Sequence, residues 1–403
     1  MMGDILFLAH RVPYPPDRGD KIRSFHLLKA LAKLGRVHLA AFADDAADEG
    51  HAAALDPYVA TRHVERRTRS QVAAGLAALR TGRPVSLALF ESAGIAGFVA
   101  QTLRERPIET IFVFSGQMAQ FVPADRGAAR FVMDFVDVDS AKFAAYADTA
   151  RQPMRRIHAR EARLLGAYEI ATAARADASL FVSEAEVALF RRHSGLGAEK
   201  VQALGNGVDL AFFDPAVAVE RPNVPTPLIV FTGQMDYPPN MAAVIRFARE
   251  SLPAIRATVP GATFAIVGRN PAPAVRALAA LPGVIVTGAV ADVRGWLAAA
   301  AVVVAPLDLA RGIQNKVLEA MAMGRPVVAS PAAFEGIEAV AGAELIVADA
   351  AGEAVAVIGL LTRPDAAARL GLAARARLVA DYSWESRLAP LAGLVTAPRA
   401  VAV

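Results

Sequence analysis

The chain has 403 residues, of which 55% are hydrophobic and 20% charged, and it contains no cysteine. This length fits two α/β domains better than one, and this composition argues against long disordered regions. The lack of cysteine excludes disulfides, thiolate zinc sites and a cysteine nucleophile, and it favours a reducing compartment. A net charge of +4 is too small to indicate wholesale nucleic-acid binding, so we expect no nucleic-acid partner.

The sequence predicts neither a signal peptide nor a membrane-spanning segment. Asp4 stands where a signal peptide wants a basic residue, and the apolar run 5–9 has only the length of a strand. The longest apolar stretch, 296–307, is shorter than the ~20 residues that span a bilayer, and it contains a proline. We therefore expect a cytoplasmic protein.

The first half of the chain alternates short apolar runs with helical patterns, as a parallel sheet with crossover helices does. The pattern begins with a strand at 5–9, a helix at 21–34 and a strand at 37–42. Further strands are predicted at 110–114, 130–135 and 178–182, and a long helix at about 153–174. These elements predict a mostly parallel sheet.

A proline-rich segment at 212–227 lacks periodicity and is typical of a linker. After it the alternation resumes, with strands at 228–233, 263–268, 284–288, 301–306 and 326–330 and helices at 239–250, 272–280, 292–299 and 314–323. The predicted fold is α/β, with two doubly wound Rossmann-like domains at 1–221 and 222–380 and a C-terminal helix within 381–403 that packs back across the junction. Ligands of such sheets lie outside the carboxyl ends of the strands, so we expect a cleft between the domains.

Two common nucleotide motifs are missing, which argues against NAD binding and against hydrolysis of a nucleoside triphosphate. The stronger signal is the helix after Gly312, in which Lys316 and Glu319 lie three residues apart near the positive helix end. Lys316 with the helix N-terminus suits a diphosphate, and Glu319 can accept hydrogen bonds from two ribose hydroxyls. On spacing alone, an exposed intrahelical ion pair is the favoured explanation of the two residues.

Two further features have a functional and a structural interpretation. Asp137 and Asp139 form an Asp-x-Asp pattern, which binds metal in some transferases but is common by chance and also suits turn capping. Arg156, Arg160 and Arg163 share one helical face, which fits a solvated surface and equally contact with anionic lipid headgroups.

Several segments together resemble the retaining sugar transferases of glycosyltransferase family 4, which have the GT-B fold. They are GNGVD at 205–209 and the stretch from VTGAVADV at 286 to PVVAS at 330. RVPYPPDRGDKIRS, MDFVDVDSAKFAAYA and DYPPN further resemble one branch, the sugar transferases associated with exosortase-type exopolysaccharide systems. The likeness covers nearly the whole chain.

The resemblance implies roles for individual residues. Glu319 matches the glutamate that binds ribose, and the amides of Gly312 and Ile313 match contacts to the donor sugar and phosphates. Gly19 matches the glycine at which the first domain meets the diphosphate, and Val290 matches backbone that holds the base.

The chain also departs from the family pattern. Arg311 stands where the first of two family glutamates belongs, and Gln234 and Asn240 lie in the loop that commonly carries an arginine and a lysine. We therefore expect Lys316, together with Arg311, to supply the positive charge for the leaving diphosphate. Separately, Asp137 and Asp139 are the candidates for orienting the acceptor.

The sequence thus predicts a retaining glycosyltransferase that uses a nucleotide-sugar donor, no cofactor and no metal. The resemblance implies a saccharide or polyprenyl-diphosphate-linked acceptor of an exopolysaccharide pathway, at the inner face of the cytoplasmic membrane. Two alternatives remain open: a nucleotide-sugar epimerase or hydrolase of the same fold, and a non-catalytic two-domain sugar-binding module. The base, sugar, linkage, acceptor and oligomeric state are left open by the sequence.

Overall fold

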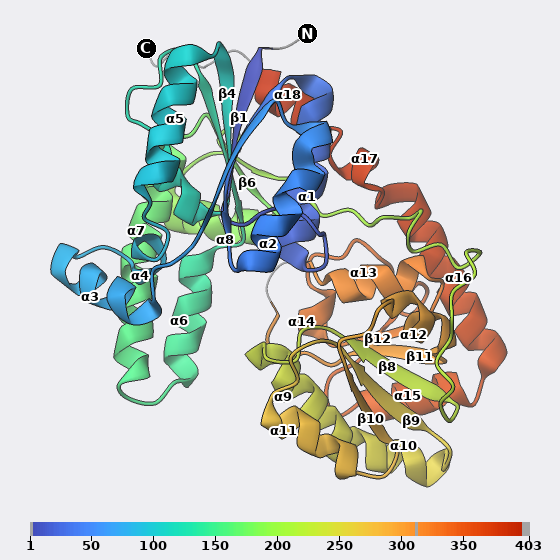
Figure 1. Ribbon diagram of the computed structural model, residues 1–403. Coiled ribbons are helices and arrows are strands. Elements are labelled where there is room, and N and C mark those ends of the chain that lie inside the picture. The colour runs from blue at the N-terminus through green and yellow to red at the C-terminus, as the bar shows by residue number, and fades with distance from the viewer. Residues whose placement is uncertain (1–2, 311–312, 397–403) are drawn as a thin grey trace. The chain divides into compact units, whose positions relative to one another are not determined.

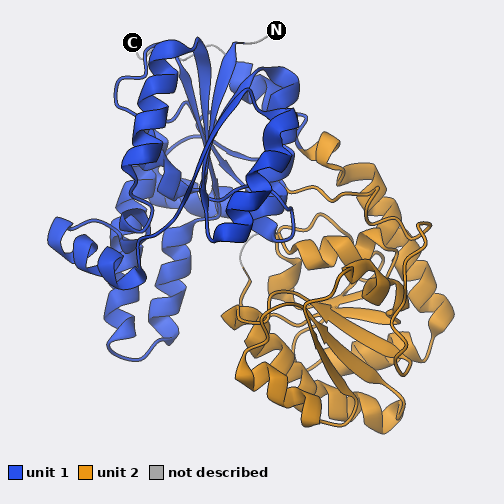
Figure 2. Ribbon diagram, viewed as in Figure 1, with its two compact units in different colours: residues 1–205, 388–403 blue, residues 206–387 orange. Residues whose placement is uncertain are grey.

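The computed structural model describes residues 3–310 and 313–396. The chain divides into two units, the first formed by residues up to 205 with those from 388 onward, and the second by residues 206–387 (Figure 2). Each unit is a parallel sheet with helices on both of its faces (Figure 1). This arrangement agrees with the two doubly wound domains predicted from the sequence.

The first unit has a seven-stranded sheet in the order β3-β2-β1-β4-β5-β6-β7. Its strands are β1 (Asp4–Ala9), β2 (Val37–Ala43), β3 (Thr61–Arg66), β4 (Ile108–Phe114), β5 (Arg130–Val136), β6 (Ala178–Phe181) and β7 (Val201–Ala203). All residues of β1 and β2 are buried, because helices cover both faces of the sheet. Such burial explains why these strands read as continuous apolar runs.

The helices of the first unit connect and cover these strands. They are α1 (Gly19–Leu34), α2 (Ala46–His51), α3 (Gln71–Thr81), α4 (Val85–Ala88), α5 (Ala93–Glu105), α6 (Asp139–Thr149), α7 (Met154–Arg175), α8 (Glu184–Ser194) and α18 (Leu391–Thr396). The helices α6 and α7 form a hairpin that projects from the sheet, and α3 projects from the same unit (Figure 1). The terminal helix α18 packs against β4 and β5, where Arg130 Nε donates to Leu394 O at 2.6 Å.

The second unit has a six-stranded sheet in the order β10-β9-β8-β11-β12-β13. Its strands are β8 (Leu228–Thr232), β9 (Thr263–Val267), β10 (Val284–Gly288), β11 (Val302–Ala305), β12 (Val327–Ala329) and β13 (Ile346–Val347). Its helices are α9 (Pro238–Arg246), α10 (Leu252–Thr258), α11 (Pro273–Arg276), α12 (Val293–Ala299), α13 (Asn315–Ala322), α14 (Pro331–Phe334), α15 (Glu353–Leu361), α16 (Pro364–Asp381) and α17 (Trp384–Arg387). Large aliphatic and aromatic side chains of these elements form one buried core.

The division between the units differs from the predicted boundary at 221/222. It falls at 205/206 because the proline-rich segment packs along the second unit. Val208 N donates to Tyr382 O at 2.7 Å, and Phe213 is buried in the core of that unit. The prolines therefore mark an extended surface segment and not the joint between the units. Similarly, the chain returns to the first unit at 388 and not at 381.

Helix length and apolarity bear on the predicted absence of membrane spans. Across residues 3–310 and 313–396, no helix combines the length and the apolar character that crossing a bilayer requires.

Candidate functional site

The strand order of the second sheet reverses between β8 and β11, because the chain passes from β8 to β9 on one side while β11 lies on the other. In open α/β sheets, ligands bind outside the carboxyl ends of the strands at such a reversal. The loop after β8 carries Gln234 and leads to Asn240 on α9, and α13 carries Lys316. Three residues singled out from the sequence therefore come from segments that flank this point.

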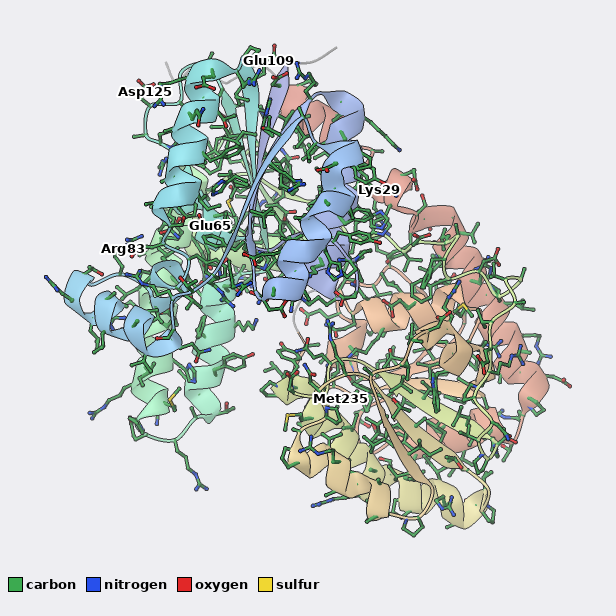
Figure 3. The ribbon with its side chains drawn as sticks, in the orientation of Figure 1. Lys29, Glu65, Arg83, Glu109, Asp125 and Met235 are labelled. Atoms are coloured by element: carbon green, nitrogen blue, oxygen red, sulfur yellow. The ribbon has the colours of Figure 1, made fainter. Side chains whose placement is uncertain are left out.

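The loops after β8 and β9 touch one another through two glycines. Gly233 N donates to Val267 O at 3.0 Å, and a Cβ atom on Gly268 would lie only 1.6 Å from Gly233 O. Met235, which Figure 3 labels, continues the contact by donating its N–H to Arg269 O at 2.9 Å. Only glycine fits at position 268. The loops after β8 and β9 are therefore packed directly against each other, and we call them the glycine loops.

The side chain of Lys316 reaches from α13 to the loop after β8. Its Nζ donates to Asn240 Oδ1 at 2.6 Å and lies 4.3 Å from the centroid of the Phe231 ring. Asn240 is buried, and its Nδ2 donates to Gln234 O at 2.9 Å, which fixes the direction of its oxygen. The ammonium group is thus held in one place by a hydrogen bond and a cation–π contact.

Lys316 and Glu319 both lie partly buried on α13. Burial lowers the pKa of Lys316 to about 7, although the charge of Glu319 opposes this shift. Burial likewise raises the pKa of Glu319 to about 7, against the attraction of Lys316. In the part of the chain that the structure describes, their charged atoms do not come within ion-pair distance, so the pair is not an exposed intrahelical salt bridge. An anionic ligand beside Lys316 would favour its charged form.

The remaining predicted donor residues have different positions. Val290 follows β10 and packs partly buried against the core of the second unit, as does Ile313 just before α13. Arg311 and Gly312 lie outside the described residues. Asn315, the first residue of α13, accepts a 3.3 Å hydrogen bond from Nδ2 of Asn206.

The first sheet reverses its strand order between β1 and β4, and a network of charged groups follows β1 there. Gly19 is the exposed first residue of α1, and Asp20 beside it accepts from Arg11 at 2.6 Å. His10 Nε2 lies 3.2 Å from the same carboxylate. Burial acts against the charge of Asp20, but the hydrogen bond with His10 and the charges of Arg11 and Arg18 hold its pKa well below the usual range.

Two residues at the carboxyl edge of the first sheet have unusual backbone angles. Ser115, after β4, has φ +77°, and Val136, the last residue of β5, has φ +74°. A β-branched residue rarely adopts a positive φ, and such strained positions cluster at functional sites. The turn at Val136 directly precedes Asp137.

Asp137 and Asp139 lie at the start of α6, among other carboxyl groups. Burial, followed by the charges of Glu186 and Asp139, raises the pKa of Asp137 to about 7. Glu186 accepts from Val138 N at 2.7 Å, so it caps the beginning of α6. Among the described residues, no group of three or more acidic or histidine side chains is arranged to hold a metal ion.

A cavity of about 710 Å³ runs along α6, α7 and α8 of the first unit. Its walls are mainly small side chains, among them Ala141, Ala144, Ala147, Ala159, Ala162 and Ala167. Arg163, His193 and Glu169 are the main ionisable groups of its lining, together with Asp148. Burial raises the pKa of Glu169 to about 8, although Ser140 donates two hydrogen bonds to this carboxyl group.

The arginines predicted to share a face of α7 do not form a uniform solvated stripe. Arg160 donates to Ala78 O at 2.8 Å and to Arg83 O at 3.4 Å, so its guanidinium ties α7 to the end of α3. Arg156 and Arg163 are exposed, and Arg163 lines the cavity just described.

Part of the second unit matches a known protein family. Residues 226–363 match the family described as "Glycosyl transferases group 1". The second unit thus contains a segment similar to the group 1 glycosyltransferases, and we call this unit the group 1 domain after that likeness.

A curated relative extends the likeness beyond this group 1 domain. The phosphatidyl-myo-inositol mannosyltransferase of Propionibacterium freudenreichii subsp. shermanii is 30% identical to the chain over 218 residues. The match covers 52% of this chain and 53% of that protein, so the chain spans about half the length of the curated relative.

Solved structures resemble the chain over almost its whole length. HepE of Anabaena, solved with UDP and glucose, has a TM-score of 0.69 at 15% identity and covers 98% of this chain and 100% of its own. Sucrose-phosphate synthase of Thermosynechococcus elongatus has a TM-score of 0.71 at 20% identity and covers 98% of each chain. The fold of the two units is therefore GT-B, as the sequence predicted.

Sequence reasoning missed two features of the group 1 domain. Phe231 reads as an ordinary core residue of β8, but its ring lies beside the Lys316 ammonium. Asn206 belongs to the GNGVD segment, yet nothing in its spacing indicates the contact with Asn315 that the structure shows. Both contacts join residues that are far apart in the chain, so local pattern contains no signal for them.

Proposed function

We propose that the chain is a retaining glycosyltransferase that moves a sugar from a nucleotide-sugar donor to a saccharide acceptor. The observation that supports this most is the position of Lys316, which Asn240 and Phe231 hold at the strand reversal of the group 1 domain. Lys316 is the second residue of α13, so its ammonium adds to the positive N-terminal end of that helix. A diphosphate bound there would meet both charges.

Glu319 is proposed to bind the ribose of the donor. It lies one turn further along α13, and its carboxylate, when ionised, can accept from two hydroxyl groups. The solved structures of HepE contain UDP, one of them with glucose and another as UDP-glucose, which supports a nucleoside-diphosphate sugar as the donor here. Gln234, Val290 and Ile313 complete the proposed donor site, together with Arg311 and Gly312.

The proposed reaction replaces one C–O bond with another on the same face of the sugar. The bond between the anomeric carbon and the diphosphate oxygen breaks, and the acceptor oxygen forms the new bond. The acceptor proton passes to the departing diphosphate oxygen, so no protein nucleophile is needed. Lys316 opposes the negative charge that grows on the diphosphate, which lowers the barrier.

The acceptor is proposed to be a lipid-linked saccharide of exopolysaccharide synthesis, bound by the first unit at the cytoplasmic face of the membrane. The sequence resemblance to the exosortase-associated branch supports the pathway, and the curated relative is by its name a transferase to a phosphatidyl-inositol lipid. The alanine-lined cavity beside α6 and α7 would suit the apolar part of such an acceptor. Asp137 and Asp139, at the start of α6, are proposed to orient the saccharide.

The test begins with thermal melts of the full chain against a panel of nucleotide-sugars, because a bound ligand raises the melting temperature. The stabilising donor is then incubated with lipid-linked and free saccharides, and the products are separated. Transfer requires free nucleoside diphosphate together with a larger saccharide. Free sugar without an enlarged acceptor would identify a hydrolase, an altered nucleotide-sugar an epimerase, and stabilisation without turnover a binding module; each would refute transfer.

A further inference from the structure

The large apolar side chains of helix α3 in the first unit face solvent instead of the domain on which the helix packs. Val72, Leu76 and Leu79 are 74%, 65% and 70% exposed. The buried face of α3 consists of Ala74 and Ala78, which form a small cluster with Ala88 of α4. A surface helix normally buries its large apolar residues, so this pattern indicates that α3 meets an apolar environment outside the chain.

The exposed residues of α3 form one stripe. Positions 72, 76 and 79 are spaced i, i+4, i+7, so their side chains lie along the same face of the helix. The tip of the α6–α7 hairpin adds Met154 and Ile157, which are 45% and 48% exposed. Both elements project from the body of the first unit (Figure 1).

These two elements are fixed to each other by polar contacts. Arg160 of α7 donates to Ala78 O at the end of α3, and Glu161 accepts from Val85 N and Ser86 N of α4, each at 2.8 Å. Arg83, labelled in Figure 3, is held by Glu91 and by Gln120. These hydrogen bonds hold α3 and α4 against α7. We call the exposed stripe of α3 and the α7 tip together the α3–α7 surface.

The charges around the α3–α7 surface are mainly positive. Four exposed arginines lie on α3, on the first turn of α7 or just before it: Arg80, Arg151, Arg155 and Arg156. None of the four makes an ion pair with another described residue. Helix α3 contains no acidic residue, Glu161 is buried in its contact with α4, and Asp148 is the exposed acid at the end of α6. An apolar stripe with a cationic border is the composition of elements that lie in the interface of an anionic bilayer.

We propose that the α3–α7 surface inserts Leu76, Leu79 and their neighbours into the headgroup region of an anionic membrane, while the arginines bind its lipid phosphates. The exposed arginines beside the stripe complement the phosphates of an anionic bilayer, which favours a lipid surface as the occupant. The inference extends the proposed membrane location of the enzyme, but its test needs no sugar transfer, so either proposal can fail alone.

The test measures co-sedimentation of the full chain with vesicles of phosphatidylcholine, alone or mixed with phosphatidylglycerol. The wild type should bind the mixed vesicles preferentially, and less at higher salt. The double variant Leu76→Gln/Leu79→Gln should bind roughly tenfold or more weakly, because burying one leucine is worth about that factor. The double variant Arg155→Gln/Arg156→Gln should lose roughly fivefold in binding per arginine and roughly half of the salt dependence, because Arg80 and Arg151 remain.

A matched control changes two equally exposed apolar residues of the second unit, Val355→Gln/Leu372→Gln, and should bind as the wild type does. As a second readout, the emission of Leu79→Trp should shift to the blue on mixed vesicles, while that of Leu372→Trp should not. Failure of the wild type to bind vesicles, or equal binding by the Leu76/Leu79 variant, would overturn the proposal. A concentration-dependent dimer that this variant abolishes, without vesicle binding, would assign the surface to a second copy of the chain instead.

Discussion

Lys316 and Asn240 are 76 residues apart in the sequence, and their side chains are joined by a hydrogen bond of 2.6 Å. This contact places the ammonium group of Lys316, a residue of α13, beside α9 and the loop that joins α9 to β8. The family that the sequence resembles commonly places an arginine and a lysine in that loop, where this chain has Gln234 and Asn240. We propose that Lys316 supplies, from another helix, the positive charge for the diphosphate.

The first prediction concerns Asn240 as the residue that positions Lys316. Asn240→Ala removes the acceptor of the ammonium hydrogen bond, so turnover should fall by roughly tenfold, in line with the loss of one such bond. Asn240→Asp keeps an acceptor for Lys316 and adds a negative charge but loses the donation to Gln234 O, so it should retain more turnover than Asn240→Ala and raise the pKa of Lys316. Steady-state rates across pH check both effects. The matched control is Asn223→Ala, an exposed asparagine, and a loss as large in this variant would contradict the positioning role.

The second prediction is the pH dependence of donor binding. Burial lowers the pKa of Lys316 to about 7, and a bound diphosphate favours the charged form. Binding must then take up a proton above this pKa, so the contribution of Lys316 to donor affinity is full below pH 7 and is lost as the pH rises above 7. Burial raises the pKa of Glu319 to about 7, so its contribution as an ionised acceptor is lost below pH 7, and the fall in affinity above pH 7 belongs to Lys316.

Calorimetric titration with the donor, in buffers of different ionisation enthalpy, measures this proton uptake directly. Lys316→Met should bind more weakly and lose the fall in affinity above pH 7. Wild-type affinity that stays constant or increases across this range would contradict the assignment of the diphosphate to Lys316.

The third prediction compares two glycines. A Cβ atom on Gly268 would lie 1.6 Å from Gly233 O, so Gly268→Ala should lower the free energy of unfolding by roughly 2 kcal/mol or more and abolish donor binding. Gly97 lies inside α5 with open space around its Cα, so Gly97→Ala should raise the free energy of unfolding by about 0.5–1 kcal/mol. Urea unfolding of both variants tests the contrast. Equal stability of the two variants would show that the contact between the glycine loops tolerates a side chain at position 268.

The fourth prediction is that sugar transfer needs no divalent metal ion. The charge of the leaving diphosphate is proposed to be met by Lys316 and the N-terminus of α13, and not through Asp137 and Asp139. Transfer by the purified chain should continue in the presence of a chelator. If activity disappears and returns with magnesium or manganese, the Asp-x-Asp pattern holds a metal and the proposed role of Lys316 is wrong.

The sequence predicted the strands that are buried on both faces most accurately. β1, β2, β8 and β9 are runs of apolar residues bounded by turn residues, and their ends fell within one or two residues of the predicted ones. The edge strand β3 was missed because its residues, TRHVER, are polar and only partly buried. The two-residue strand β13 was missed as well, since such a short strand has no detectable period.

Only those features of the candidate site that depend on the spacing of residues within one helix could be predicted from the sequence. Lys316 and Glu319 share one helix, so their proximity follows from the period of the helix. The contacts of Lys316 with Asn240 and Phe231 depend on the strand order of the sheet, which no local pattern encodes. The same limit applies to Arg160, which was predicted to lie on a solvated or a lipid-contacting face but donates to the backbone of α3.

The central claim is that Lys316 and Glu319 bind the donor of a sugar transfer, and two single variants test it most directly. Calorimetric titration with the donor, beside single-turnover rates, is made for Glu319→Ala and Lys316→Ala. Glu319→Ala should weaken donor binding by about 2 kcal/mol, the scale for hydrogen bonds to a charged group. Lys316→Ala should lower the single-turnover rate more than the affinity, because charge on the diphosphate grows as the sugar departs. Wild-type affinity and wild-type rate in both variants would contradict the proposed donor site.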